Sequence, residues 1–292
     1  MKFAFMASVE AAEYSYDFLS ENLGVSKSGF YKWKKARPTQ TRKSHDEYLL
    51  VRKIEDIHTG SRKVYGSPRI HAVLKGLEPT VSKRKVERLM KKYDIRSKTK
   101  RKFKVTTYSK HKLKVAPNHL QRNFTAYVPN QVWSSDITYV PTQKGWLYLC
   151  VVMDLFSRKI VGWTLEDHMR ASLVAGALES AIKQRSPDPL LTFHSDRGVQ
   201  YASGEVKKVL TTHSIIPSMS RKGDCWDNSI TESFFGKFKT EHMFWEKYET
   251  KDEARRKIFE WIEIDYNRKR IHSAIGYVTP EKFEEDNRMR KV

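Results

Sequence analysis

Apolar side chains in the first hundred residues recur three or four positions apart, the spacing of one face of an α-helix. From about Asp46 onward, Leu49, Leu50, Ile54 and Ile57 follow this spacing. Serine, glycine and proline residues, which cap or interrupt helices, stand between the periodic segments. The pattern therefore predicts that the front of the chain consists of helices joined by short turns.

Residues 13–35 carry the signals of a helix-turn-helix unit. Gly24 can form the tight turn between two short helices, and Ser26 can cap the second one. That second helix would expose basic side chains beside aromatic ones, as a DNA-reading helix does. The basic candidates are Lys32, Lys34 and Lys35. Short turns of this kind also join helices that bind no DNA. Residues 37–42, which include Pro38, are predicted to be a linker.

A second helix-turn-helix unit is predicted further along. Pro68 suits the first turn of one helix, and Ser82 can cap the next. On this last helix Val86, Leu89 and Met90 form a narrow apolar stripe, and the other faces are basic. The candidates for DNA contact are Lys83, Arg84, Lys85 and Arg88. A solvated helix face is the alternative for any one of them.

The pattern changes near residue 130, where β-branched and aromatic residues become frequent. The predicted elements are strands at 132–140, 146–155 and 159–164, a helix at 171–185, a strand at 190–196, a helix at 203–213, a strand at 215–219 and a helix from Asn228. The second strand is almost continuously apolar, which is typical of a central strand covered on both faces. This order indicates a mixed α/β domain.

The charge is divided unevenly between the two parts. Residues 1–130 hold 30 lysines and arginines against 11 aspartates and glutamates, whereas residues 131–292 hold 25 against 23. A basic N-terminal region joined to a nearly neutral C-terminal region indicates a polyanion-binding module attached to a domain with a different function. The basic run at 96–104 adds phosphate-contact candidates, which are Lys100, Arg101 and Lys102.

The sequence also bears on location. Its two cysteines, Cys150 and Cys225, are too few for a disulfide framework, and no metal-binding Cys/His spacing occurs. The start is too short in apolar residues for a signal peptide, and no apolar run is long enough to span a bilayer. We expect a cytoplasmic protein, associated with the nucleoid and without membrane contact.

Three acidic residues stand out by position. Strand alternation places Asp136 with Ser134 and Thr138 on one face, and Asp196 ends an apolar strand. Glu232 lies on a small, polar stripe of the predicted helix, and Lys239 follows two turns later on nearly the same face. A spacing of seven is too long for a helical ion pair, so a shared substrate explains the two better.

These residues carry a family resemblance. Thirty-five residues separate Asp196 from Glu232, a spacing that resembles the DD(35)E signature of bacterial insertion-sequence transposases and retroviral integrases. Four segments resemble the second-frame transposases of two-frame insertion sequences. They are residues 133–139, 194–201, 218–228 and 266–280.

The resemblance implies an RNase H-like core, a mixed five-stranded sheet with flanking helices, preceded by a helical DNA-binding region. It implies that Asp136, Asp196 and Glu232 bind two Mg²⁺ ions, with Mn²⁺ as a substitute, and catalyse DNA cleavage and strand transfer. Asp136 would bridge both ions, and Lys239 would hold a DNA phosphate. The implied partners are double-stranded DNA at the terminal inverted repeats and at the target, further copies of the chain, and the upstream frame's product, as a fusion.

Other residues near these motifs are weaker candidates. His194 shares the strand face of Asp196 and is a candidate for contact with DNA or metal-bound water. Asp154 either supports the site from behind or makes a structural hydrogen bond, and the second is favoured. Arg221 and Lys222 are predicted to contact DNA from a mobile loop over the site.

The expected organisation has five parts. They are a helix-turn-helix-like segment at 1–40, a second one at 41–105, a basic linker at 106–128, the catalytic core at 129–285 and a tail at 286–292. Two alternatives remain: an RNase H-like nuclease that cuts without joining, and a non-catalytic DNA-binding regulator of transposition made without the upstream frame.

Overall fold

A computed structural model describes residues 1–8, 14–98, 115–221 and 225–289, with residues 38–41 and 225 described by their backbone alone. The chain divides into two compact units, Met1–Ser97 and Lys98–Val292.

The first unit begins with a small helical cluster. It consists of α1 (Lys2–Ser8), α2 (Tyr16–Leu23) and the start of α3 (Lys27–Gly60). Gly24 ends α2 in the left-handed conformation, with φ 60°, and the Ser26 hydroxyl caps α3 by accepting a 3.1 Å hydrogen bond from the Gly29 N–H. Both turn signals act as the sequence predicted. Met6, Leu19 and Phe30 form the buried centre of this cluster.

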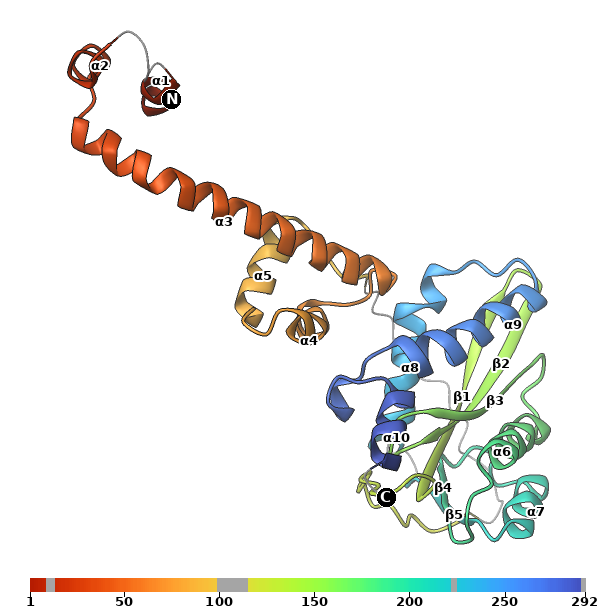
Figure 1. The fold of residues 1–292 in the computed structure, drawn as a ribbon. Helices are drawn as coiled ribbons and strands as arrows, with labels where there is room; N and C mark the ends of the chain where they lie inside the picture. Colours follow the sequence, from red (N-terminus) through yellow and green to blue (C-terminus); the bar gives the residue numbers. More distant parts are fainter. Residues whose placement is uncertain (9–13, 99–114, 222–224, 290–292) are drawn as a thin grey trace. The chain divides into compact units, whose positions relative to one another are not determined.

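The predicted linker at 37–42 is wrong, because α3 runs as one helix of 34 residues from Lys27 to Gly60 (Figure 1). A proline inside a helix removes one backbone hydrogen bond and costs about 3 kcal/mol. The rest of this helix offsets that cost, since it is rich in strong helix formers and anchored at both ends by packed residues such as Phe30 and Ile54.

The second helical cluster forms around the end of α3. It contains α4 (Ser67–Leu77), with Pro68 in its first turn, and α5 (Lys83–Lys92), capped by Ser82. As predicted, Val86, Leu89 and Met90 are the buried side of α5. The basic side chains of α5 are therefore left on the outside.

The second unit contains a five-stranded sheet in the order β3-β2-β1-β4-β5. Its strands are β1 (Val132–Thr142), β2 (Gly145–Asp154), β3 (Ile160–Glu166), β4 (Thr192–Ser195) and β5 (Ile216–Met219). The first three strands pair antiparallel, whereas β4 is parallel to both β1 and β5. The expected mixed sheet of an RNase H-like core is confirmed. Strand β4 begins later than predicted because Leu190 lies in a left-handed turn, with φ 76°.

Helices cover both faces of the sheet (Figure 1). One core lies under α6 (Ala171–Arg185) and α7 (Gly204–Thr212) and contains Trp133 and Phe193. The other lies under α8 (Ser229–Glu241), α9 (Lys251–Glu260) and the π-helix η3 (Trp261–Lys269), and contains Val151 and Phe238. Short 3₁₀ helices are η1 (Cys225–Asn228), η2 (Met243–Trp245) and η4 (Ser273–Ile275).

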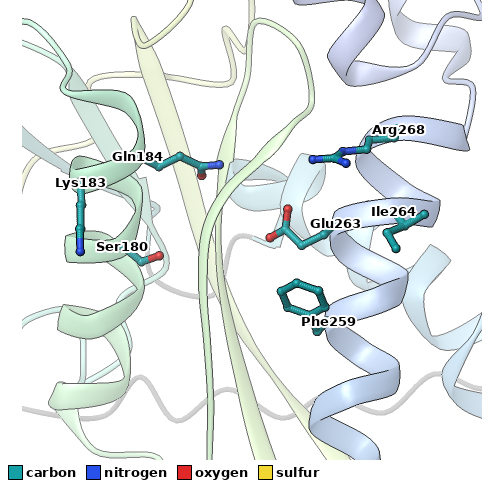
Figure 2. A pocket seen from close by; sticks show the side chains of 7 residues that line it. All are labelled: Ser180, Lys183, Gln184, Phe259, Glu263, Ile264 and Arg268. Carbon is teal, nitrogen blue, oxygen red and sulfur yellow. The ribbon is translucent and has the colours of Figure 1, made fainter.

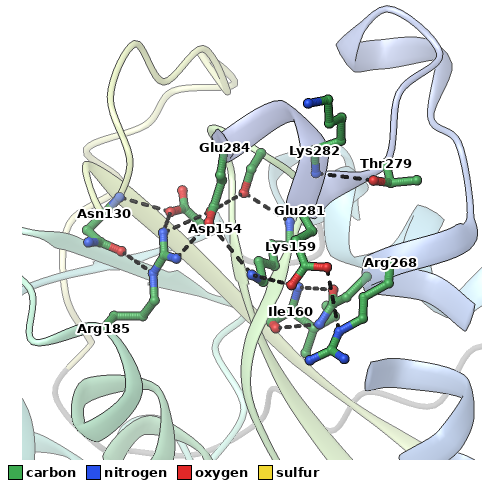
Figure 3. A network of polar contacts seen from close by, with 12 residues as sticks. Asn130, Asp154, Lys159, Ile160, Arg185, Arg268, Thr279, Glu281, Lys282 and Glu284 are labelled. Atoms are coloured by element: carbon green, nitrogen blue, oxygen red, sulfur yellow. Dashed lines mark hydrogen bonds and ion pairs between the residues drawn. The ribbon is translucent and has the colours of Figure 1, made fainter. Parts of the chain in front are cut away.

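The last helix, α10 (Pro280–Met289), is fixed to the sheet by a buried charged network (Figure 3). Arg185 donates to Asp154 Oδ2 at 3.1 Å and to Glu284 Oε2 at 2.8 Å. The Ser157 hydroxyl donates to Glu284 Oε1 at 2.7 Å. These contacts join α6, the end of β2 and α10. Among the described residues, no helix combines the length and the hydropathy that a membrane span requires.

Candidate active site

The parallel pairing of β1 and β4 brings two aspartates to the same level of the sheet. Ser134 lies opposite His194, and Asp136 and Asp196 each follow two residues later. Because neighbouring strands are about 4.8 Å apart, the backbones that carry the two carboxylates lie about one strand spacing apart. Burial and then the charge of Asp196 raise the pKa of Asp136 well above its ordinary value, and a hydrogen bond from the Ile137 N–H opposes that rise.

Glu232 reaches this place from the first turn of α8. Two hydrogen bonds dock the start of this helix on β1: the Ser134 hydroxyl lies 2.6 Å from the Thr231 hydroxyl and 2.8 Å from Asn228 Oδ1. Loss of water and then the charge of Asp196 raise the pKa of Glu232, and Glu232 in turn raises that of Asp136. Asp136, Asp196 and Glu232, the acidic triad, therefore converge.

Lys239 lies two turns further along α8 and is half-buried. Loss of water lowers the pKa of its ammonium group, and the charge of Asp136 opposes that fall. Lys239 thus lies within electrostatic reach of Asp136.

A tight turn after β4 holds Asp196. The Gly198 N–H donates to Asp196 Oδ1 at 2.8 Å. A Cβ atom at position 198 would lie 2.9 Å from that oxygen, closer than a carbon and an oxygen can approach without displacing each other. A glycine is therefore needed here for the carboxylate to keep its position.

The triad fits a hard divalent cation. Burial first, and then repulsion from the charge of Asp196, raise the pKa values of Asp136 and Glu232. A divalent cation relieves this repulsion, and Mg²⁺ prefers carboxylate oxygens. Among the described residues, the group whose ligand atoms all lie within 4.8 Å of one another is not the triad but Glu166, Asp167 and His168. That group lies largely on the surface, where Lys251 pairs with Asp167 at 3.3 Å.

Comparison with known protein families and sequences agrees with this geometry. The family described as "Integrase core domain" matches residues 126–225 and 213–280, and an "HTH-like domain" matches residues 44–103. The chain is 37% identical over 292 residues to the transposase InsF for insertion sequence IS3A of Escherichia coli (strain K12), across 98% of this chain and 99% of that one. The chain belongs to the insertion-sequence transposases.

Two further proteins resemble the transposase. An "Insertion element IS600 uncharacterized 31 kDa protein" of Shigella sonnei is 41% identical over 262 residues, across 90% of this chain and 96% of that one. The HTLV-2 integrase catalytic core domain in complex with magnesium is 17% identical, across 54% of this chain and 97% of that one, with a TM-score of 0.41. The sheet order and the family matches support the RNase H-like fold without this weak structural likeness.

His194 has a structural position in the transposase. It is fully buried, its Nδ1 lies 2.9 Å from the Ser218 hydroxyl, and its Nε2 lies 2.9 Å from the Asp227 carbonyl oxygen. Burial lowers the pKa of the imidazole, which favours the neutral ring. With both ring nitrogens bonded inside the protein, His194 is not placed to contact DNA or metal-bound water.

Asp154 makes structural hydrogen bonds, which is the role that the sequence analysis favoured for it. Its carboxylate is fully buried and accepts hydrogen bonds from the N–H groups of Asn130, at 2.9 Å, and Phe156, at 3.0 Å, besides that of Arg185. Asp154 pairs with Trp133 across β1 and β2. Trp133 precedes Asp136 by three residues along β1. Burial raises the pKa of Asp154 to about 6.

Arg221 is held by the protein itself. Its Nε and Nη2 donate to the two carboxylate oxygens of Asp227 at 3.0 and 2.9 Å, and its side chain is half-exposed. Lys222, Lys100, Arg101 and Lys102 lie outside the described residues. The expected mobile loop also falls largely there.

The basic candidates of the first unit are exposed. They are Lys32, Lys34, Lys35, Lys83, Arg84, Lys85 and Arg88. Some also have partners within the unit: Lys34 Nζ lies 3.4 Å from the Tyr16 hydroxyl, and Lys83 pairs with Glu87 at 3.7 Å. Their exposure leaves them accessible to DNA.

A hollow on the surface of the second unit lies away from the triad. It has a volume of about 600 Å³ and lies between α6 and the α9–η3 segment, as Figure 2 shows. Its lining includes Lys183, Phe259 and Arg268, and no member of the triad. Its Glu263 is engaged, since it accepts a 2.8 Å hydrogen bond from the Trp163 indole N–H.

Sequence reasoning did not single out three residues that shape the site: Asn228, Asp227 and Arg122. Asn228 docks α8 on β1, and Asp227 accepts hydrogen bonds from Arg122 and Arg221. The first two lie in the segment 218–228 that carried the family resemblance, which was the available signal. Arg122 had none, because its partner is more than a hundred positions away.

Proposed function

We propose that Asp136, Asp196 and Glu232 are the catalytic carboxylates of this transposase, and that each binds at least one of two Mg²⁺ ions. The observation that carries the proposal is their approach from β1, the end of β4 and α8, where burial and then the charge of Asp196 raise the pKa values of Asp136 and Glu232. Mn²⁺ is the expected substitute, because it accepts the same oxygen ligands.

Two bound cations would lower the pKa of the attacking hydroxyl and stabilise the leaving oxygen of the DNA phosphate. Asp136, on which the charges of both Asp196 and Glu232 act, would bridge both positions. Asp196 and Glu232 would complete one position each. Lys239 would bind a DNA phosphate and so orient the strand toward the triad.

The first unit and the basic linker would bind the element ends. We propose the segments 1–40, 41–105 and 106–128 for this role, the core at 129–285 and a tail at 286–292, with α3 joining the first two segments. The exposed lysines and arginines of α3 and α5 would contact phosphates or bases. The oligomer on DNA, the fusion with the upstream frame's product and association with the nucleoid belong to the same proposal, supported by the basic charge of the front region.

Substitution of the triad tests the proposal. Asp136→Asn, Asp196→Asn and Glu232→Gln remove one negative charge each with little change of shape. Each should abolish metal-dependent cleavage and joining of a labelled duplex carrying the element's end, and should leave binding of that duplex largely intact. Activity retained by any of the three would overturn that residue's assignment.

The same assay separates the alternatives. Cleavage without joined products from a labelled 3′ end would identify a nuclease. Binding without either product, in this chain and in its fusion with the upstream frame's product, would identify a regulator. The fusion should be compared with the single chain, because the upstream product could supply DNA binding that the chain needs.

A further inference from the structure

A single buried carboxylate beside the triad holds two arginines. Asp227 lies in η1, and its side chain has no exposed surface. Its oxygens accept hydrogen bonds from Arg221, at 2.9 and 3.0 Å, from Arg122 Nε at 3.2 Å and from Asn118 Nδ2 at 2.8 Å. The Arg221 backbone N–H adds another at 2.9 Å.

Two arginines keep this carboxylate charged. Hydrogen bonds from Arg221 and Arg122 keep the pKa of Asp227 far below its ordinary value, so it stays ionised. The anion is enclosed, whereas the side chains of Arg122 and Arg221 are 49% and 55% exposed. Asp227 therefore holds two half-exposed guanidinium groups at the surface from below.

The fold places this charge at the edge of the sheet where the catalytic aspartates lie. Strands β4 and β5 are parallel, with Ser195 opposite Met219, so Ser220 and Arg221 follow β5 as Asp196 follows β4. The Ser220 N–H donates to the Ser195 carbonyl oxygen at 2.9 Å. On the other side, His194 contacts the Asp227 carbonyl oxygen.

We propose that Arg122 and Arg221 together bind a DNA backbone phosphate next to the one that the triad cleaves. Arginine is suited to this role because its planar, always charged guanidinium forms paired hydrogen bonds with phosphate oxygens. Asp227 orients both side chains before DNA arrives, which reduces the entropy lost on binding. This inference rests on the proposed function of the triad.

A purely structural role explains the group less well. To satisfy a buried carboxylate, one cation together with the Asn118 amide and the Arg221 N–H would suffice. An additional half-exposed arginine adds little stability, since ion pairs at the surface contribute about 0–1 kcal/mol. It does add charge at the same edge of the sheet as Asp196.

The test measures how salt affects binding of a labelled duplex that carries the element's end. Loss of one phosphate contact should lower the slope of log K against log salt concentration by about 1. Arg122→Gln and Arg221→Gln should each show this change, with binding at low salt weakened about 10-fold, as expected for a hydrogen bond to a charged group. Arg122→Lys should keep the slope, because it keeps the charge. Arg256→Gln, an exposed arginine of α9, is the matched control and should behave as wild type.

Wild-type slopes in Arg122→Gln and Arg221→Gln would overturn the proposal. If one glutamine variant fails to fold, shown by its thermal unfolding, the other decides. Failure of the triad's proposed role is a separate result. In that case the wild-type transposase would not cleave the duplex in Mg²⁺, while the arginine variants would still change the salt dependence.

Discussion

Ser134 and Asn228 join the strand that carries Asp136 to the helix that carries Glu232, through a 2.8 Å hydrogen bond between Ser134 Oγ and Asn228 Oδ1. The Asn228 amide also donates to the Ser135 carbonyl oxygen at 3.2 Å, and all three residues are buried. Asn228, together with Thr231, thus fixes the relative position of two catalytic candidates that are 96 residues apart in sequence.

Asn228→Ala should misplace Glu232 more than it destabilises the protein. Losing these hydrogen bonds leaves buried polar groups unpaired and costs about 1–3 kcal/mol. The Mg²⁺ concentration needed for half-maximal cleavage should rise about 10-fold, since outer hydrogen bonds tune metal affinity by about this much. Metal titration of cleavage, at a temperature where unfolding curves show the variant folded, measures this. An unchanged Mg²⁺ requirement would contradict the positioning role.

Gly198→Ala should lower the cleavage rate. The added Cβ would displace the Asp196 carboxylate, and a misplacement of about 1 Å can cost about 100-fold in rate. Single-turnover cleavage at saturating DNA measures the effect. The control is Gly204→Ala, at a position with open space around it, which should cleave as wild type. Wild-type cleavage by the Gly198 variant would show that the turn can yield.

Gly162→Ala should destabilise the core without touching the site. A Cβ at this position of β3 would lie 2.4 Å from the Ala177 carbonyl oxygen and 2.6 Å from Ala181 Cβ, both in α6. Overpacking of this kind costs about 1–3 kcal/mol. Denaturant unfolding should show a lower midpoint, again relative to Gly204→Ala. An unchanged midpoint would mean that α6 can move away from the sheet.

Asp154 should make the folded protein less stable as the pH rises, which is the reverse of the usual effect of an aspartate. Its pKa is about 6 in the folded protein and 3.8 in the unfolded chain, so the folded state holds the proton more tightly. This contribution to stability is present below pH 3.8, is lost as the pH rises toward 6 and is flat above. The change is about 3 kcal/mol, at about 1.4 kcal/mol per pKa unit.

The comparison that isolates this effect is wild type against Asp154→Asn. The difference in unfolding free energy between them should move against the wild type as the pH rises from about 4 to 6. Denaturant titrations at several pH values measure it. A difference that does not vary with pH would show that the Arg185 ion pair offsets the burial of Asp154 entirely.

The sequence by itself determined the local structure of this transposase and the identity of its catalytic candidates. As predicted, Ser26 and Ser82 cap the starts of α3 and α5, and Pro68 lies in the first turn of α4. These signals could be read from the sequence because caps and first-turn prolines act on adjacent backbone groups. Alternation along β1 placed Asp136 and Trp133 on opposite faces of the sheet. The spacing from Asp196 through Glu232 to Lys239 indicated one site. The predicted linker at 37–42 failed because packing at both ends of α3 outweighed a local proline signal.

Only the tertiary structure decided the contacts between distant segments. His194 became a buried structural residue, and Arg221 and Arg122 met at Asp227, because these partners come together when β4, β5 and α8 pack. Burial and partner charges set the pKa values of Asp136 and Glu232, and both depend on neighbours that a linear pattern does not specify. Short-range rules name the groups that do chemistry, whereas the free energy of packing fixes which of them meet.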